Sequence, residues 1–91
     1  MYWELLPGYS LIQSGIDDLL RGVQSVPALL VSIGAPRLRR LGMPVPASTI
    51  PSAELRLYEL LQQDCPDGAH SRYNALVRRL VSFERAAECA N

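Results

Sequence analysis

Only one segment of this chain, the apolar run VPALLVSI at Val26 to Ile33, has the composition of a buried β-strand. A buried strand must hydrogen-bond to a neighbouring strand, because unpaired backbone amides and carbonyls are strongly unfavourable in a protein interior. No second strand candidate exists elsewhere in the sequence to pair with it. The run is therefore predicted to be a buried helix, and the whole protein is predicted to be all-α.

The length and composition predict a single helical domain over residues 1–91. Hydrophobic residues make up 48% of the chain and charged residues 20%, which is ordinary for a globular protein. A chain of this size can support one modest core with little to spare.

Turn residues mark out the first helix. Pro7-Gly8 predicts a turn after the N-terminal segment MYWELL. Ser10 is then expected to cap a helix, although Gly15 within it costs about 1 kcal/mol relative to alanine. The apolar stripe of this helix is predicted to contain Ile12, Ile16, Leu19, Leu20 and Val23.

The second helix is predicted to begin at a Ser25 cap and to end at Gly34. Pro36 is expected to open a separate helical turn, PRLRRLG, which Gly42 ends. A proline-rich connector at about 43–52 follows and is predicted to be extended along the surface of the bundle.

Two further helices are predicted in the second half. Ser52 is expected to cap the segment AELRLYELLQQD, and the last and longest helix runs from Asp67 or Ser71 to about Cys89. Because a tight turn joins them, these two helices should pack antiparallel. The predicted fold is thus a compact bundle of four to five short helices with a long C-terminal helix.

The formal net charge is zero, but the charges are unevenly distributed. Residues 54–67 carry four acidic side chains and one arginine, whereas residues 70–85 carry four arginines and one glutamate. Arg72 and Arg79 are therefore expected to face the acidic helix. The helical periodicity places Arg78 and Arg85 on the opposite side of the last helix, where this attraction does not account for them.

Arg37, Arg39 and Arg40 form a second basic cluster, which the sequence alone does not join to the first. Three interpretations remain open for these arginines: a solvated face, a surface for an acidic protein, and a surface for nucleic acid. A helix-turn-helix over residues 25–44, turning at residues 34–36, would leave only about six residues for its recognition helix. The zero net charge also disfavours nucleic acid.

All nine basic residues are arginines. Arginine is favoured where bidentate contact with carboxylate or phosphate matters. The complete absence of lysine, together with many alanines, is more typical of codon usage in a GC-rich genome. The sequence therefore indicates a GC-rich bacterium, its phage or a mobile element.

No catalytic, cofactor or metal site is predicted. Cys65 and His70 lie beside a Pro-Gly turn and have only Asn74 as a third group, a weak basis for a catalytic pair. Metal binding needs more ligands than one histidine and the distant cysteines Cys65 and Cys89. Gly-rich phosphate loops and GxSxG motifs are also absent from the sequence. An enzyme is not expected.

The aromatic N-terminus has two interpretations. Tyr2 and Trp3 either cover one end of the bundle or form an exposed anchor for a partner or for a second copy of the chain. The first residues lack the basic and apolar regions of a signal peptide, and the apolar run at residues 26–33 is too short to cross a membrane. A cytoplasmic protein with reduced thiols is expected.

These observations favour a small non-enzymatic helical module that binds another protein as an inhibitor, adaptor or regulatory subunit. The alternative is a small DNA- or RNA-binding transcriptional regulator that uses an arginine patch. A homodimer is also compatible with the sequence. The candidate partner-binding residues are Arg37, Arg39, Arg40, Arg78, Arg85, Tyr2 and Trp3.

Overall fold

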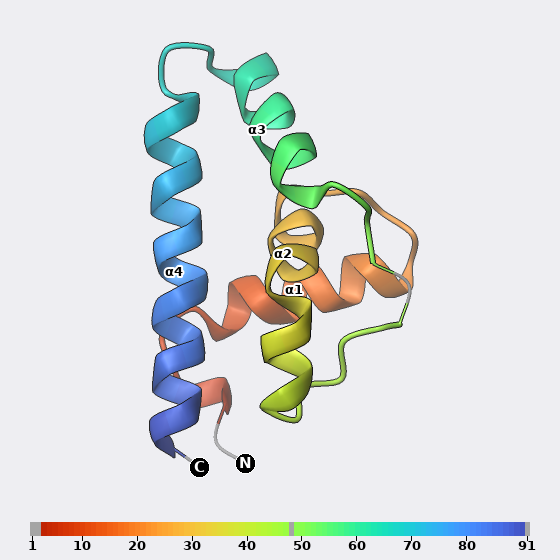
Figure 1. Ribbon diagram of the computed structural model, residues 1–91, viewed down its shortest axis with the longest axis vertical. Helices are drawn as coiled ribbons and strands as arrows, with labels where there is room; N and C mark the ends of the chain where they lie inside the picture. The colour runs from red at the N-terminus through yellow and green to blue at the C-terminus, as the bar shows by residue number, and fades with distance from the viewer. Residues whose placement is uncertain (1–2, 48, 91) are drawn as a thin grey trace.

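In the part of the chain that the structure describes, four α helices and one short 3₁₀ helix make up the fold (Figure 1). The structure is a computed structural model, and it describes residues 3–47 and 49–90. The elements are η1 (Trp3–Leu5), α1 (Tyr9–Leu20), α2 (Val26–Arg40), α3 (Ala53–Asp64) and α4 (Ala69–Ala90). Over the described residues there is no strand, and the prediction of an all-α bundle with a long C-terminal helix is confirmed.

α2 is the central element and packs against α1, α3 and α4 (Figure 1). Its N-terminal half is apolar on nearly all sides, which is the pattern of a fully buried helix. Leu30, Val31 and Leu38 have no exposed surface, and Phe83 of α4 is equally buried. The apolar run at residues 26–33, which has the composition of a buried strand, is thus the first half of the helix against which the other helices pack.

The corner between α1 and α2 depends on Gly22. Gly22 has a φ of 72°, and its amide together with that of Val23 bonds back to the carbonyls of Leu19 and Asp18. This is the Schellman arrangement that ends a helix, so Val23 lies outside α1 and is 45% exposed. The prediction that Leu20 and Val23 belong to the buried apolar stripe was wrong, since Leu20 is 69% exposed as well. Ser10 does not cap α1 either, because the helix begins at Tyr9 after a left-handed Gly8.

Ser25 caps α2 as predicted and also ties it to α1. Its Oγ accepts a hydrogen bond from the Ala28 amide at 3.2 Å and donates one to Asp18 Oδ2 at 2.5 Å. This hydroxyl, with the Arg21 guanidinium as the second cause, lowers the pKa of Asp18 below its usual value.

α2 is one continuous helix through Gly34 and Pro36, so the predicted break at Gly34 was wrong. A Cβ at Gly34 would lie 2.9 Å from Leu80 Cδ1, which shows that the glycine permits close contact with α4 rather than ending α2. Pro36 removes one helical hydrogen bond, but its ring is on the exposed side. The helix-turn-helix considered above is excluded, because its supposed turn is helical.

The proline-rich connector returns the chain along the bundle to α3. Met43 and Val45 are buried, and the Ile50 amide donates to Ser32 Oγ at 3.2 Å. α3 and α4 then run antiparallel, as predicted (Figure 1). Ser52 precedes α3 in a left-handed conformation with a φ of 53°, and its side chain makes no cap hydrogen bond, contrary to the prediction.

The α1–α2 contact predicts that Gly15→Ala destabilises the protein. A Cβ at Gly15 would lie 2.3 Å from the Pro27 carbonyl oxygen and 2.4 Å from Val31 Cγ2, so the helices must move apart. We expect a loss of about 1–3 kcal/mol in the free energy of unfolding, measured by urea denaturation. In an exposed helix the same change would instead stabilise the protein by up to about 1 kcal/mol.

Ser14→Ala is the matched control, because Ser14 is exposed on the same helix. Its free energy of unfolding should stay within about 0.5 kcal/mol of the wild type. A Gly15→Ala protein as stable as the Ser14→Ala protein would contradict the tight packing of α1 on α2.

Candidate partner-binding site

α4 exposes Arg78 and Arg85 away from the bundle. The helix packs on the core through Leu80, Phe83 and Ala87, which are at most 2% exposed. Arg78 and Arg85 lie on the other side, where the sequence pattern places them. Neither makes an ion pair or a side-chain hydrogen bond within the described part of the chain.

Arg37 is half-buried and holds the C-terminal half of α2 against α4. Its Nε and Nη2 atoms lie 2.9 and 2.7 Å from Glu88 Oε1, and its Nη1 lies 3.7 Å from Glu84 Oε1. The charge of Arg37 is therefore balanced within the molecule. This arginine stabilises the fold and is not free to attract an acidic partner.

The other two arginines of the second cluster diverge. Arg39 turns towards the connector and donates a hydrogen bond to the Pro46 carbonyl oxygen. Arg40 is exposed and, like Arg78 and Arg85, has no ion pair with any residue that the structure describes. The three neighbouring arginines of the sequence thus have three different environments, and only Arg40 remains available.

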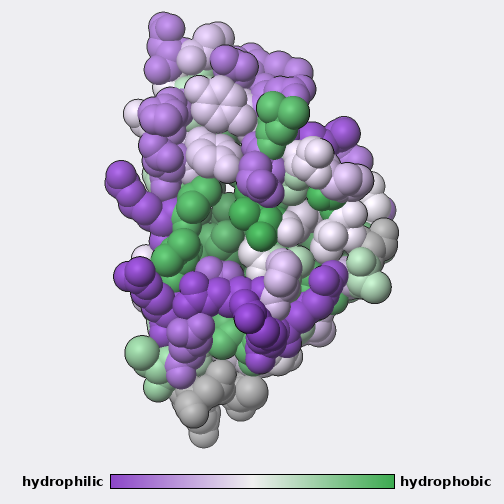
Figure 2. All heavy atoms as spheres, viewed as in Figure 1, coloured by the Kyte–Doolittle hydropathy of each residue, from purple (hydrophilic) through white to green (hydrophobic). Residues whose placement is uncertain are grey.

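A hollow of about 290 Å³ lies between α2 and α4. We call it the α2–α4 groove; it is lined by Ile33, Gly34, Pro36, Arg37, Arg40, Val77, Leu80, Val81 and Glu84. Its apolar side chains Ile33, Val77 and Val81 are half-buried, so they are accessible from outside. Figure 2 shows hydrophobic side chains gathered between α4 and α2, with a band of hydrophilic side chains across the end nearer the termini.

We give the name arginine rim to three exposed arginines that form no ion pair within the described residues: Arg40, which lines the groove, and Arg78 and Arg85, which lie beside it on α4. Arg40 lines the groove together with Val81. Arg78 precedes Val81 by three residues and Arg85 follows it by four, so both are its neighbours on the α4 surface. The two basic clusters of the sequence thus meet only in part, because Arg78 also lines the separate hollow at Pro7 and Gly8. Arg37 lines the groove as well, but its charge is balanced by Glu84 and Glu88, and Arg39 bonds to the connector.

Glu84 is a buried carboxylate at the base of the groove, 4% exposed. Its Oε2 would lie 3.1 Å from a Cβ at Gly34, so it packs against the backbone of α2. Burial raises the pKa of Glu84, while Arg37 and, more weakly, Arg40 oppose that rise. The sequence alone does not show the burial of Glu84, because that burial depends on Gly34 in another helix.

Arg72 and Arg79 of α4 were both predicted to face the acidic helix α3, and only Arg72 does so. Arg72 Nη1 lies 2.6 Å from Asp64 Oδ2, which confirms the first contact. Arg79 was predicted to face the acidic helix as well, and this was wrong. It borders a hollow with Pro7 and Gly8 before α1, because its backbone packs against the turn at Gly8.

The remaining polar residues weighed in the sequence lie apart from this groove. Cys65 and His70 are exposed at the α3–α4 turn, and His70 Nε2 lies 3.2 Å from Asn74 Nδ2. Within residues 3–47 and 49–90, no three His, Cys, Asp or Glu side chains are grouped as metal ligands would be.

Trp3 packs against the core, the first of the two roles that the sequence left open. Its side chain is half-buried, and the indole Nε1 is buried without a hydrogen bond to any described group. Tyr2 lies outside the described residues. Leu5, next to this segment, is 76% exposed.

Comparison of the chain with family models, with curated proteins and with solved structures gave no match. None of the helices described is both long and apolar enough to span a membrane, in agreement with the sequence-based prediction.

The position of Glu84 predicts a pH-dependent effect of Glu84→Gln. The folded protein raises the pKa of this carboxyl group, so its ionised form is disfavoured by folding. The contribution of Glu84 to stability is therefore greatest below its unfolded pKa and declines as the pH rises through its folded pKa. We expect Glu84→Gln to be more stable than the wild type at neutral pH, with the difference shrinking in acid.

Urea denaturation at neutral and acidic pH measures this difference. Glu88→Gln is the control, because Glu88 is more exposed and its substitution removes a close ion pair with Arg37. Its free energy of unfolding should fall by about 0.2–1 kcal/mol at neutral pH, the opposite sign. A Glu84→Gln effect that does not vary with pH would rule out ionisation of Glu84 as its cause.

Proposed function

We propose that this chain is a small non-enzymatic module that binds another protein at the α2–α4 groove, as an inhibitor, adaptor or regulatory subunit. One observation carries the proposal: an accessible apolar groove is lined by Arg40 and flanked on α4 by Arg78 and Arg85, and none of the three forms an ion pair within the described residues. Apolar surface supplies binding free energy, and unpaired charge supplies selectivity for a complementary partner.

The chemistry of the groove favours an acidic amphipathic segment as its occupant. An amphipathic helix lays its apolar residues into a groove of this kind and keeps polar residues at the edges. Ile33, Val77 and Val81 would contact the apolar side of that segment. Arg40, Arg78 and Arg85 would pair with carboxylates on its edges, and arginine is well suited to such contacts because its guanidinium binds them in a bidentate manner.

Nucleic acid is the second candidate, because the same three arginines could contact phosphates. Three features argue against it. The groove that Arg40 lines is largely apolar, and the carboxylates Glu84 and Glu88 lie at or near it, where they pair with Arg37. A zero net charge also gives little long-range attraction for a polyanion.

The cellular setting is also a proposal. Cys65 and Cys89 are free and exposed, which suits a reducing compartment such as the cytoplasm. The exclusive use of arginine supports a GC-rich bacterium, its phage or a mobile element as the source.

The proposal predicts that Arg78→Glu with Arg85→Glu abolishes capture of the partner from a lysate of the source organism. Both arginines are exposed, so the circular dichroism spectrum should not change. Val81→Ser should weaken the same capture, because it removes apolar contact surface from the groove. Quantitative mass spectrometry of the captured proteins measures both effects.

Arg21→Glu with Arg72→Glu is the charge-matched control, since neither residue lines the groove or neighbours Val81 on the α4 surface. Both arginines form surface ion pairs, so the control must also keep the wild-type circular dichroism spectrum. It should capture the same partner as the wild type. If the Arg78 and Arg85 variant still captures that partner, the arginine rim is only a solvated face.

Fluorescence anisotropy with labelled duplex and single-stranded oligonucleotides tests the second candidate. Micromolar or tighter binding that collapses between about 50 and 200 mM salt would indicate several phosphate contacts and favour nucleic acid. The absence of binding at the lower salt concentration is the result we expect.

A further inference from the structure

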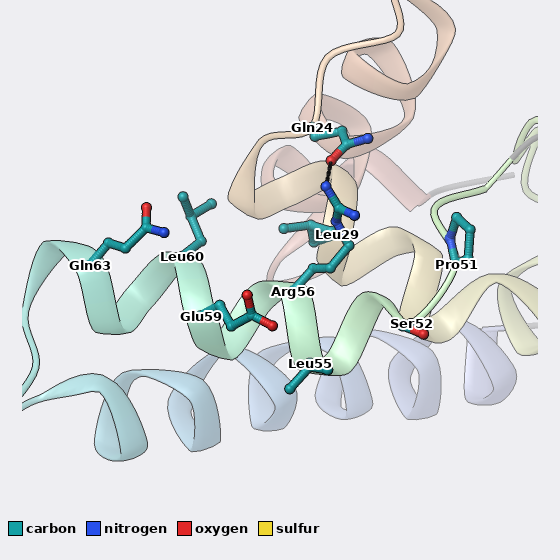
Figure 3. A pocket seen from close by; sticks show the side chains of 9 residues that line it. All are labelled: Gln24, Leu29, Pro51, Ser52, Leu55, Arg56, Glu59, Leu60 and Gln63. Atoms are coloured by element: carbon teal, nitrogen blue, oxygen red, sulfur yellow. Dashed lines mark hydrogen bonds between the residues drawn. The ribbon is translucent and has the colours of Figure 1, made fainter.

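A second hollow, of about 480 Å³, lies between α3 and the α1–α2 turn, and it shares no residue with the α2–α4 groove (Figure 3). The α3 side of this hollow is formed by six residues at alternating spacings of three and one, the pattern of a continuous helix stripe. We call it the α3 stripe: Ser52, Leu55, Arg56, Glu59, Leu60 and Gln63.

The α3 stripe carries exposed apolar surface. Leu55 is 62% exposed although it lies on an otherwise polar side of the helix. An adjoining hollow shares Gln24 and Pro51 with this one and is bordered by Val23, which is 45% exposed. Two of the large apolar side chains most exposed in the described chain therefore border adjoining hollows, and exposed apolar surface of this kind is typical of contact surfaces.

The charges of the α3 stripe are self-complementary. Arg56 and Glu59 are both exposed; Arg56 donates a hydrogen bond to Gln24 Oε1 at 2.7 Å, shown dashed in Figure 3. Neither forms an ion pair with a residue that the structure describes. The stripe thus holds one cation and one anion, each without an opposite charge.

The order of residues along the stripe is symmetric about the midpoint between Leu57 and Tyr58. Read in the opposite direction, Arg56 takes the place of Glu59, Leu55 that of Leu60, and Ser52 that of Gln63. A second α3 laid antiparallel about a two-fold axis would therefore bring each Arg56 level with Glu59 of the other copy. The two Leu55 side chains would lie along one edge of the helix pair and the two Leu60 side chains along the other.

We infer that α3 is the contact surface of a homodimer in which two copies of this chain pair their α3 helices antiparallel. A two-fold interface uses the same patch on both copies and must therefore be complementary to itself, which the α3 stripe is. This surface differs from the N-terminal end considered in the sequence, and the inference is independent of the proposed function.

The charges allow a test by exchange. Arg56→Glu alone would set two glutamates against each other on both sides of the two-fold axis, and Glu59→Arg alone would set two arginines there. Each variant should weaken self-association by about tenfold or more, because like charges face each other twice. An equimolar mixture of the two variants restores both opposite-charge pairs and should dimerise again.

Sedimentation equilibrium over a range of protein concentrations measures the mass. The wild type should rise from 10.1 kDa towards twice that value, each single variant should remain near 10.1 kDa at the concentrations at which the wild type dimerises, and their mixture should rise again. Glu54→Arg is the control for Glu59→Arg, with the same charge change on α3 outside the stripe, and it should still dimerise.

Recovery in the mixture would also show that both variants are folded. A wild type that stays at the mass of one chain at every concentration would overturn the inference. So would a dimer that persists in both single variants, or a mixture of variants with wild-type circular dichroism spectra that fails to associate.

Discussion

The close approach of α1 and α4 to α2 at two glycines determines how the rest of the molecule is arranged. α2 is buried on nearly every side in its N-terminal half, so other helices must cover it. Gly15 of α1 meets the backbone of α2 at Pro27, and Gly34 of α2 accepts the side chains of Leu80 and Glu84. Because these two positions have no Cβ, the helices pack at short distance around the small core.

The electrostatics of the candidate site follow from this packing. Because α4 lies so close to Gly34, the carboxylate of Glu84 is buried and Arg37 is drawn to the same interface. Arg37 and Glu88 then balance each other at the edge of the contact. The buried carboxylate is unfavourable by itself, so an arginine that the sequence offered for binding is used to hold two helices together.

Local signals in the sequence were sufficient to predict most of the helices, but few of the contacts between them. The cap at Ser25, the turn at Gly42 and the antiparallel order of α3 and α4 depend on neighbouring residues and could be predicted. Gly34 was misinterpreted because a glycine that ends a helix and one that allows close packing look the same in sequence. Likewise, the exposure of Arg78 followed from helical periodicity, whereas the apolar groove beside it requires knowledge of which helices meet.

Although the net charge is zero, the arginines and the glutamates that form no ion pair lie on different parts of the molecule. Of the nine arginines, Arg21, Arg37 and Arg72 form ion pairs and Arg39 and Arg56 bond to neutral oxygens, which leaves Arg40, Arg78, Arg79 and Arg85. Within the described chain, Glu54 and Glu59 of α3 also lack ion pairs. Salt screens exposed charges beyond about 8 Å at physiological ionic strength, so opposite patches on a neutral protein give little long-range attraction. A partner recognised at the α2–α4 groove would therefore be selected by direct contact with Val81 and the arginine rim rather than by the overall field of the protein.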